Sequence, residues 1–397
     1  MSMVRRVLVP FLIMALPVAA MMAYILYAGK AKINESKSAA DTVQTVSFGM
    51  ANWTIFRGDQ QLTGQAEGEL PDTLSLKSQF TTDGEVKATP VVADGIVYVG
   101  SADKQVYALD LQTEKRLWQT ELDGEIEASC LILDNCIYVG TMKGTLFALN
   151  HKDGKILWSF KSRDKVAGSV NCAEANEQAI ILLASYDGTM YALDIEGTLL
   201  WKYETDSYIN GTPAVFNSTA AVGGCDAFLH LVPLTDPNNV RKVDTESYIP
   251  SSPAVLDGMA YVGNFEGSIL AIDTHKAKIV WTYKNKDASF FAACAAADDI
   301  IVAGSREGNL YILDRATGKE KHVFKAGNSI ESSPVICGNK VVFGCNDGRL
   351  YIVNTVDGKE IWSYNLGRPI ISSPAVANNL VLVGCDDGNV YVFGESD

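Results

Sequence analysis

Residues 330–369 read IESSPVICGNKVVFGCNDGRLYIVNTVDGKEIWSYNLGRP, and the same pattern starts again at residue 370 as IISSPAVANNLVLVGCDDGNVYVF. Toward the N-terminus, related units recur at intervals of 40, 40, 43, 40, 41, 40 and 40 residues. The eight units start at Val86, Ile126, Val166, Ile209, Ile249, Phe290, Ile330 and Ile370. A period of this length indicates a repeat architecture, in which one unit cannot bury its apolar faces alone.

Each unit contains four short β-type segments separated by turn residues. Small residues and proline, as in Ser332-Ser333-Pro334, start the first strand, and a two-residue turn leads to a second strand rich in β-branched residues. An acid and a glycine precede the third strand, and a Gly-Lys turn precedes the fourth. The acid–glycine pairs include Asp187-Gly188, Asp347-Gly348 and Asp387-Gly388. We interpret them as turns that need a positive φ rather than as calcium loops.

Four strands in each repeat, without helical periodicity, predict an all-β fold: an eight-bladed β-propeller of four-stranded blades. The eighth unit stops after its third strand, at residues 390–393. Its missing fourth strand has to come from elsewhere, and we expect residues 74–81, just ahead of the first unit, to supply it. This pairing would close the ring and leave only short, protected strand edges.

Tryptophans recur at one position of the fourth strand, eight or nine residues before the next unit. The five are Trp118, Trp158, Trp201, Trp281 and Trp362. Arg241, His322 and Ser78 take this position in the other three units. Because the ring is repeated from unit to unit, we interpret it as packing between blades rather than as cofactor binding.

The N-terminus predicts a membrane anchor. Arg5 and Arg6 precede 22 uncharged residues, 7–28, and a helix of that length spans roughly 33 Å. The alternative is a cleaved signal peptide with a site near Ala20. We expect an anchor in residues 1–30, a polar linker in 31–49 and the propeller in 50–397. The two arginines favour a cytoplasmic N-terminus, which places the propeller on the extracytoplasmic, periplasmic side of the inner membrane.

Composition excludes several classes of protein. The 397 residues are 47% hydrophobic and 20% charged, which is enough apolar sequence for a large core. The formal net charge is −14, so a nucleic-acid partner is not expected. The four histidines are widely spaced and form no metal-ligand motif, and no Ser-His-Asp arrangement or phosphate loop stands out. We therefore predict no catalytic, cofactor-binding or metal-binding residues.

From Trp53 to the C-terminus the chain resembles the pyrroloquinoline-quinone-type repeats of the quinoprotein-like propellers. The resemblance includes residues 53–58, WTIFRG, which look like the lead-in to the ring in that family. In size and layout the chain is most similar to the non-catalytic, BamB-like members. That resemblance implies a scaffold among envelope proteins, with the machinery that assembles outer-membrane barrels as a partner.

The resemblance also implies an enzymatic alternative, a quinone-dependent dehydrogenase. Such members carry adjacent cysteines over the cofactor, and Glu, Asn and Asp around a calcium ion. The eight cysteines here are Cys130, Cys136, Cys172, Cys225, Cys294, Cys337, Cys345 and Cys385, and none is adjacent to another. Since Cys130 and Cys136 are expected on opposite faces of their blade, they cannot bridge, and we interpret the thiols as small apolar fillers.

The sequence thus predicts a monomeric, membrane-anchored propeller that acts as a protein scaffold and not as an enzyme. A binding module for a small ligand or polysaccharide at the propeller axis is the alternative, and a central pocket with converging polar groups would favour it. The fourth unit, with Asp236-Pro237-Asn238-Asn239 and no tryptophan, is either a tolerated irregularity or a partner-binding loop.

Overall fold

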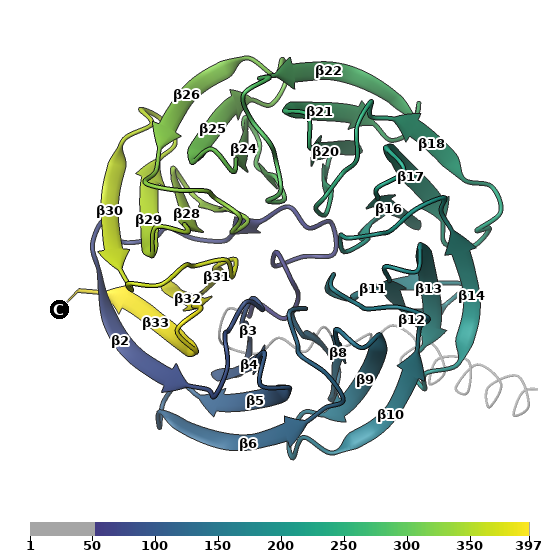
Figure 1. Ribbon diagram of the computed structural model, residues 1–397, viewed down its shortest axis with the longest axis horizontal. Coiled ribbons are helices and arrows are strands. Elements are labelled where there is room, and N and C mark those ends of the chain that lie inside the picture. The colour runs from purple at the N-terminus through teal and green to yellow at the C-terminus, as the bar shows by residue number, and fades with distance from the viewer. Residues whose placement is uncertain (1–51, 397) are drawn as a thin grey trace, which may run out of the picture. The chain divides into compact units, whose positions relative to one another are not determined.

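A computed structural model describes residues 52–396 of the chain. The predicted anchor and linker, residues 1–30 and 31–49, lie outside these residues. Between residues 52 and 396 there is no helix with the length and apolarity needed to span a membrane. The described chain forms eight sheets arranged as blades around a central axis (Figure 1), so the prediction of an eight-bladed, all-β propeller is confirmed.

Each blade has a short inner strand, two central strands and a longer outer strand. Blade 1 contains β3 (Val91–Ala93), β4 (Ile96–Gly100), β5 (Gln105–Asp110) and β6 (Lys115–Glu121). Blade 2 contains β7 (Leu131–Leu133), β8 (Cys136–Gly140), β9 (Thr145–Asn150) and β10 (Ile156–Lys161). Blade 3 contains β11 (Asn171–Ala175), β12 (Gln178–Ala184), β13 (Thr189–Asp194) and β14 (Leu199–Glu204). Blade 4 contains β15 (Ala214–Phe216), β16 (Thr219–Gly223), β17 (Phe228–Pro233) and β18 (Arg241–Asp244).

The second half of the ring repeats this arrangement. Blade 5 contains β19 (Ala254–Leu256), β20 (Met259–Gly263), β21 (Ser268–Asp273) and β22 (Lys278–Lys284). Blade 6 contains β23 (Ala295–Ala296), β24 (Ile300–Gly304), β25 (Asn309–Asp314) and β26 (Glu320–Lys325). Blade 7 contains β27 (Val335–Cys337), β28 (Lys340–Gly344), β29 (Arg349–Asn354) and β30 (Glu360–Asn365). Blade 8 contains β31 (Ala375–Ala377), β32 (Leu380–Gly384), β33 (Asn389–Glu395) and β2 (Leu74–Thr81).

Strand β2 closes the ring, as the sequence predicted. It pairs antiparallel with β33, from Leu74 opposite Glu395 to Thr81 opposite Asn389, with a bulge near Leu76. The Thr81 hydroxyl also donates a 2.7 Å hydrogen bond to the Asn389 side chain. Figure 1 shows β2 at the outer edge of the blade that contains the C-terminal strands. Blade 8 is therefore built from both ends of the described chain.

Neighbouring blades interlock through a glycine and an apolar side chain. The second strand ends in glycine in every blade except blade 3, where β12 ends at Ala184. A Cβ atom on Gly100 would lie 2.1 Å from the side chain of Ile126, the first residue of the blade 2 repeat. The same contact closes the ring, since a Cβ on Gly384 would lie 2.5 Å from Val86. All eight predicted starting residues are fully or almost fully buried. The repeat spacing therefore reflects a close contact between blades that favours glycine, and alanine in blade 3, at the end of the second strand.

The small residues at the start of each unit are not in strands, which corrects one expectation. The inner strand begins after them, for instance at Val91 in blade 1 and Val335 in blade 7. Cys130 and Cys294 thus immediately precede β7 and β23 rather than lying inside those strands. The small residues form extended segments that approach the axis before the inner strand starts, and this places them around the centre of the ring.

The propeller has two distinct faces. The linker face carries the segments that connect one blade to the next and the turns between second and third strands. The hairpin face carries the turns between first and second strands and between third and fourth strands. These names are used below for the two ends of the central channel.

Candidate functional site

The lead-in segment, residues 53–66, crosses the centre of the ring and pairs with one inner strand after another (Figure 1). Trp53 exchanges backbone hydrogen bonds with Val92 of blade 1. The carbonyl groups of Thr54, Gln60, Gln61, Thr63 and Gly64 then accept backbone N–H groups from blades 2, 4, 5, 6 and 7 in turn. Finally β1 (Gln65–Ala66) runs parallel to β27. This segment is a plug on the hairpin side of the channel.

Arg57 holds the plug in place from inside. Its side chain is 1% exposed, and its two terminal nitrogens donate 2.7 Å hydrogen bonds to the carbonyl oxygens of Cys294 and Pro334, in the segments leading to β23 and β27. Burial lowers the pKa of the guanidinium to about 10, while Asp59 opposes this shift. The group remains charged at neutral pH, and its bonds connect the plug to blades 6 and 7.

A ring of hydroxyl groups, here called the hydroxyl belt, surrounds the axis on the linker side of the plug. Its members are Thr89, Ser129, Ser169, Thr212, Ser252, Ser333 and Ser373, one from each blade except blade 6, where Ala293 takes the position. All are at least nine-tenths buried. Backbone N–H groups of one blade donate to the hydroxyl of the next: Thr89 to Ser129 (3.1 Å), Ser129 to Ser169 (2.9 Å), Thr212 to Ser252 (2.8 Å), Ala293 to Ser333 (3.0 Å) and Ser333 to Ser373 (2.9 Å).

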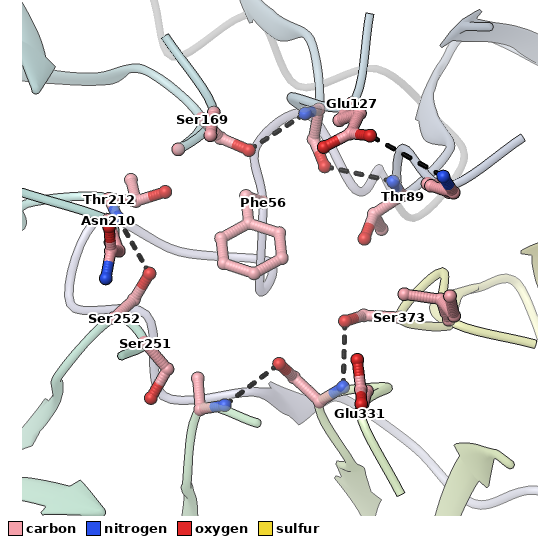
Figure 2. Close-up of a pocket in the computed structure, with 18 of the residues that line it drawn as sticks. Phe56, Thr89, Glu127, Ser169, Asn210, Thr212, Ser251, Ser252, Glu331 and Ser373 are labelled. Carbon is pink, nitrogen blue, oxygen red and sulfur yellow. Dashed lines mark hydrogen bonds and ion pairs between the residues drawn. The ribbon is translucent and has the colours of Figure 1, made fainter. Parts of the chain in front are cut away.

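The hydroxyl belt encloses a cavity of about 180 Å³. Figure 2 shows the Phe56 ring near its centre, with hydroxyl groups of the belt around it. Phe291 and Ile371 add apolar surface to the lining. The arrangement is an axial pocket with an apolar floor and a polar wall, which is the composition of a small-molecule site.

Charged side chains line the rim of the axial pocket. Lys87 forms ion pairs with Glu85 (2.8 Å) and Glu127 (3.6 Å), and its hydrogen bond to Glu85 raises the pKa of the lysine. Across the ring, Glu331 pairs with Arg306 at 3.0 Å. Near Lys87, burial and the charge of Glu85 raise the pKa of Asp386. The rim of blades 8, 1 and 2 is thus predominantly acidic.

Blades 3 to 6 present a different surface on the linker face. Five side chains, here called the aromatic arc, lie on their connecting segments and turns: Tyr186, Tyr208, Tyr248, Phe265 and Phe291. Tyr186 stacks on Tyr208 with centroids 5.6 Å apart, and Tyr248 stacks on Phe265 at 4.6 Å. Phe265 meets Phe291 edge-on at 5.9 Å. Tyr208 and Phe265 remain 54% and 40% exposed.

Cations flank the aromatic arc at both ends. The Lys165 ammonium lies 3.9 Å from the centroid of Tyr186, and the Arg306 guanidinium carbon lies 3.5 Å from that of Phe291. Both distances are within the range of a cation–π interaction. The linker face is therefore divided into an aromatic, cation-flanked half and an acidic half.

The predicted tryptophan position lies where blades meet. Trp118, Trp158 and Trp281 each donate their indole N–H to a carbonyl of the following blade, those of His151 (3.1 Å), Ile195 (2.9 Å) and Arg315 (2.9 Å). Arg241 and His322, which replace tryptophan in blades 4 and 6, bond in the same way to His275 and Val356 at 2.7 Å. Trp201 packs in the apolar cluster of blades 3 and 4, and Trp362 meets Phe393 of blade 8 edge-on.

The acid–glycine pairs lie in tight turns on the linker face. Gly188, Gly348 and Gly388 have φ values of 79°, 84° and 85°. Asp187, Asp347 and Asp387 each accept the hydroxyl hydrogen of the tyrosine four residues later, at 2.5–2.6 Å. These carboxylates also accept backbone N–H groups, so their oxygens are occupied by donors of the protein itself.

Three features of the site were not predicted from the sequence. They are the course of the plug beyond residue 58, the convergence of the hydroxyl belt and the aromatic arc. The aromatic arc is partly visible in the sequence. In the turn after the second strand, blades 3 and 5 have the aromatic residues Tyr186 and Phe265, whereas blades 1 and 2 have Ala102 and Met142. The irregular blade 4 contributes a short outer strand, β18, of four residues.

Comparison with known proteins gives the family. A family model described as "Outer membrane protein assembly factor BamB" matches residues 57–213 and 178–396. The chain belongs to this BamB-like family. No curated protein matches the sequence.

Solved structures confirm the BamB-like fold. BamB from Moraxella catarrhalis has a TM-score of 0.68 and 21% identity, and the match covers 82% of this chain and 98% of that one. Quinohemoprotein alcohol dehydrogenase from Comamonas testosteroni has a TM-score of 0.73 and 13% identity, covering 87% and 81%. A europium-containing methanol dehydrogenase has 0.68 and 12%, covering 87% and 98%. At these identities the likeness shows the fold alone.

The dehydrogenase neighbours raise the question of whether the axial pocket fits pyrroloquinoline quinone and its metal ion. In the part of the chain that the structure describes, no three His, Cys, Asp or Glu side chains are grouped as metal ligands. The rim presents Glu127 and Glu331 toward a cofactor that itself carries carboxylates, and its one lysine is already paired with Glu85. The residues of this BamB-like pocket therefore do not fit that cofactor.

Proposed function

We propose that this protein is a membrane-anchored scaffold that binds another envelope protein through the aromatic arc on its linker face. The observation that carries the proposal is the exposure of Tyr208 and Phe265 on the linker face. Tyrosine, phenylalanine and arginine are enriched in protein–protein interfaces, where the aromatic rings provide large contact areas. Membership of the BamB-like family supports this role.

The division of the linker face suggests how a partner is oriented. Lys165 and Arg306 border the aromatic arc, whereas Glu85, Glu127 and Asp386 lie on the opposite half. A partner with an acidic border on one side and basic residues on the other would match both halves. Such complementary charge mainly sets orientation and association rate rather than affinity. The periplasmic part of the outer-membrane barrel-assembly machinery is the partner that we propose.

The proposal includes the membrane anchor. Residues 7–28 are long enough to cross a bilayer, and Arg5 and Arg6 favour retention of the N-terminus in the cytoplasm. The propeller would then lie on the periplasmic side of the inner membrane. Protease added to spheroplasts would degrade the propeller under this topology and would spare it if the propeller faced the cytoplasm.

The decisive experiment is site-specific photo-crosslinking in native membranes. A photoreactive phenylalanine analogue at Tyr208 should give a specific product that contains a barrel-assembly protein. Val280, on the outer strand β22, is 57% exposed and is the matched control position, from which that product should be absent. The same product from Val280 but not from Tyr208 would contradict the proposed surface.

A second measurement uses variants of the full-length protein. Tyr208→Ser and Phe265→Ser together should reduce capture of the barrel-assembly protein at least tenfold, whereas Val280→Ser should not change it. All three positions are substantially exposed, so the thermal unfolding temperature should shift little. Undiminished capture by the double variant would exclude the aromatic arc as the interface.

A further inference from the structure

We infer that the axial pocket is a binding site for a single neutral pyranose ring, a site distinct from the proposed protein interface. The inference starts from the hydrogen bonds of the hydroxyl belt. Ser129, Ser169, Ser252, Ser333 and Ser373 each accept a backbone N–H from the preceding blade. Among the described residues, none of these five hydroxyl groups donates to a further protein acceptor.

This bonding pattern leaves five hydroxyl hydrogens for a molecule in the cavity. A serine hydroxyl carries one donor and two acceptor sites, and here an acceptor site of each is used by the backbone. The neighbouring serines of the same segments behave differently: Ser332 donates to the carbonyl of Ser372 at 2.9 Å, and Ser372 donates to that of Ala88 at 3.0 Å. The hydroxyl hydrogens of Ser332 and Ser372 are thus used within the protein, unlike those of the five belt serines.

The floor and the rim of the pocket also match the chemistry of a sugar ring. Figure 2 shows the Phe56 ring face-on at the centre of the hydroxyl belt. A flat apolar face matches the C–H face of a pyranose, whose oxygens would then point outward to the belt. Glu127 and Glu331 at the rim, and the side-chain oxygen of Asn210, which has no hydrogen-bond partner, can accept hydrogen bonds from sugar hydroxyl groups.

Charge and volume narrow the ligand class. The cavity of about 180 Å³ is smaller than the roughly 300–1,000 Å³ of sites for drug-sized ligands, so it accommodates one small ring. Glu127 and Glu331 disfavour an anionic sugar, because Lys87 is already paired with Glu85. A neutral pyranose can be a free monosaccharide or the terminal residue of an envelope glycan, and these two sources share the same recognition chemistry.

Differences between the blades of this chain indicate which substitutions in the hydroxyl belt should keep the fold. Alanine already stands at the belt position of blade 6, as Ala293, and threonine stands there in blades 1 and 4. The triple variant Ser129→Ala, Ser169→Ala, Ser252→Ala removes three donors from the pocket. Ser332→Ala is the matched control, because it removes an equally buried hydroxyl that points to the backbone instead.

The test measures binding of glucose, galactose, mannose and N-acetylglucosamine to the full-length protein by saturation-transfer NMR and calorimetry. At least one should bind saturably. The triple variant should weaken that binding about tenfold or more, because three hydrogen bonds to the sugar are lost. Phe56→Leu should weaken it as well, and Ser332→Ala should leave it unchanged. Thermal unfolding of each variant establishes that the propeller is intact.

Further measurements distinguish a free monosaccharide from the end of a glycan chain, and other results would overturn the inference. If an oligosaccharide ending in the same sugar binds as well as the monosaccharide, the ligand is a chain end. If only the monosaccharide binds, it is a free sugar. Absence of saturable binding to all four sugars would overturn the inference, and so would glucuronate binding as tightly as glucose. Neither result depends on the protein partner, so this inference and the proposed scaffold role fail independently.

Discussion

The indole N–H of Trp158, on the outer strand of blade 2, donates a 2.9 Å hydrogen bond to the carbonyl oxygen of Ile195 in blade 3. The ring also covers Gly197, which has a φ of 87° and where an added Cβ would lie 2.7 Å from the indole. Two adjacent blades are thus joined by one side chain that combines packing with a polar contact. His322 preserves both contacts, since an added Cβ on Gly358 would lie 2.7 Å from its side chain, and Arg241 preserves the polar contact.

Replacing Trp158 should separate these two contributions. Trp158→Phe removes the hydrogen bond but keeps a ring, so we expect a loss of about 1 kcal/mol in the free energy of unfolding. Trp158→Ala should cost roughly 2–3 kcal/mol, less than the 3–5 kcal/mol of a fully buried tryptophan, because part of the ring is exposed. Urea unfolding of both variants measures the difference, and equal costs would show that packing contributes little.

Arg57 should be among the most sensitive residues of the plug. In Arg57→Met the carbonyl groups of Cys294 and Pro334 lose their donors, and a buried unpaired group costs about 1–3 kcal/mol. We therefore expect a loss of roughly 2–5 kcal/mol in unfolding free energy. Arg57→Lys should recover only part of it, because an ammonium cannot reach both carbonyls with the same fork geometry. Full recovery by lysine would contradict the bidentate role.

His230 should make the stability dependent on pH. The side chain is fully buried between Asp226 and Tyr203, at 2.9 Å from each. Burial lowers its pKa, with a smaller contribution from Lys242, while Asp226 and Asp206 oppose the shift. A histidine pKa lowered in the folded state means that the unfolded chain binds the proton more strongly. Stability is then complete above the unfolded value of about 6.5 and falls as the pH decreases below it.

The measurement compares unfolding midpoints at pH 7.5 and pH 5 for wild type and His230→Gln. Glutamine can donate to Asp226 and accept from Tyr203 but does not titrate, so the variant should lose less stability on acidification. His322→Gln, at the circumference of the ring, provides the control for a general effect of removing histidine. A wild-type protein that is equally stable at both pH values would refute the role of His230.

The cysteines should differ in reactivity according to burial. All eight lie in the described part of the chain and are free thiols, and burial raises the pKa of Cys130 and Cys294 to about 12. Iodoacetamide at pH 8 should therefore leave these two unmodified in the native protein and modify the half-buried Cys136 and Cys225 first. Unfolding without a reductant should expose all eight. Fewer than eight modified residues under that condition would reveal an oxidised pair.

The sequence was sufficient to predict the parts of the fold that repeat. A small residue, glycine in seven blades and alanine in blade 3, and a buried apolar residue recur because each blade interlocks with the next, as Gly100 does with Ile126. The bounds of β2 were predictable for a related reason, since a three-stranded last unit has to borrow a strand. The equivalence of Arg241 and His322 with tryptophan also followed from spacing, and their shared carbonyl contacts give it a physical basis.

The axial pocket could not be predicted, because it depends on closure of the ring. Ser129 and Ser373 belong to different units, and only the circular arrangement brings their hydroxyl groups to one cavity. The small size of these residues is visible in the sequence, but it is equally compatible with a strand interior. The plug has no periodic pattern, since its backbone bonds to a succession of different blades.

Pairing of β2 with β33 has a consequence for the order of folding. Thr81 and its partner Asn389 are 308 residues apart in the chain. At roughly 5–20 residues per second of synthesis, β2 waits on the order of 15–60 s for its partner strand. During that interval an amphipathic strand with an unpaired edge is exposed to other chains. Synthesis of β33, the last strand, therefore ends the period in which this protein is most prone to aggregate.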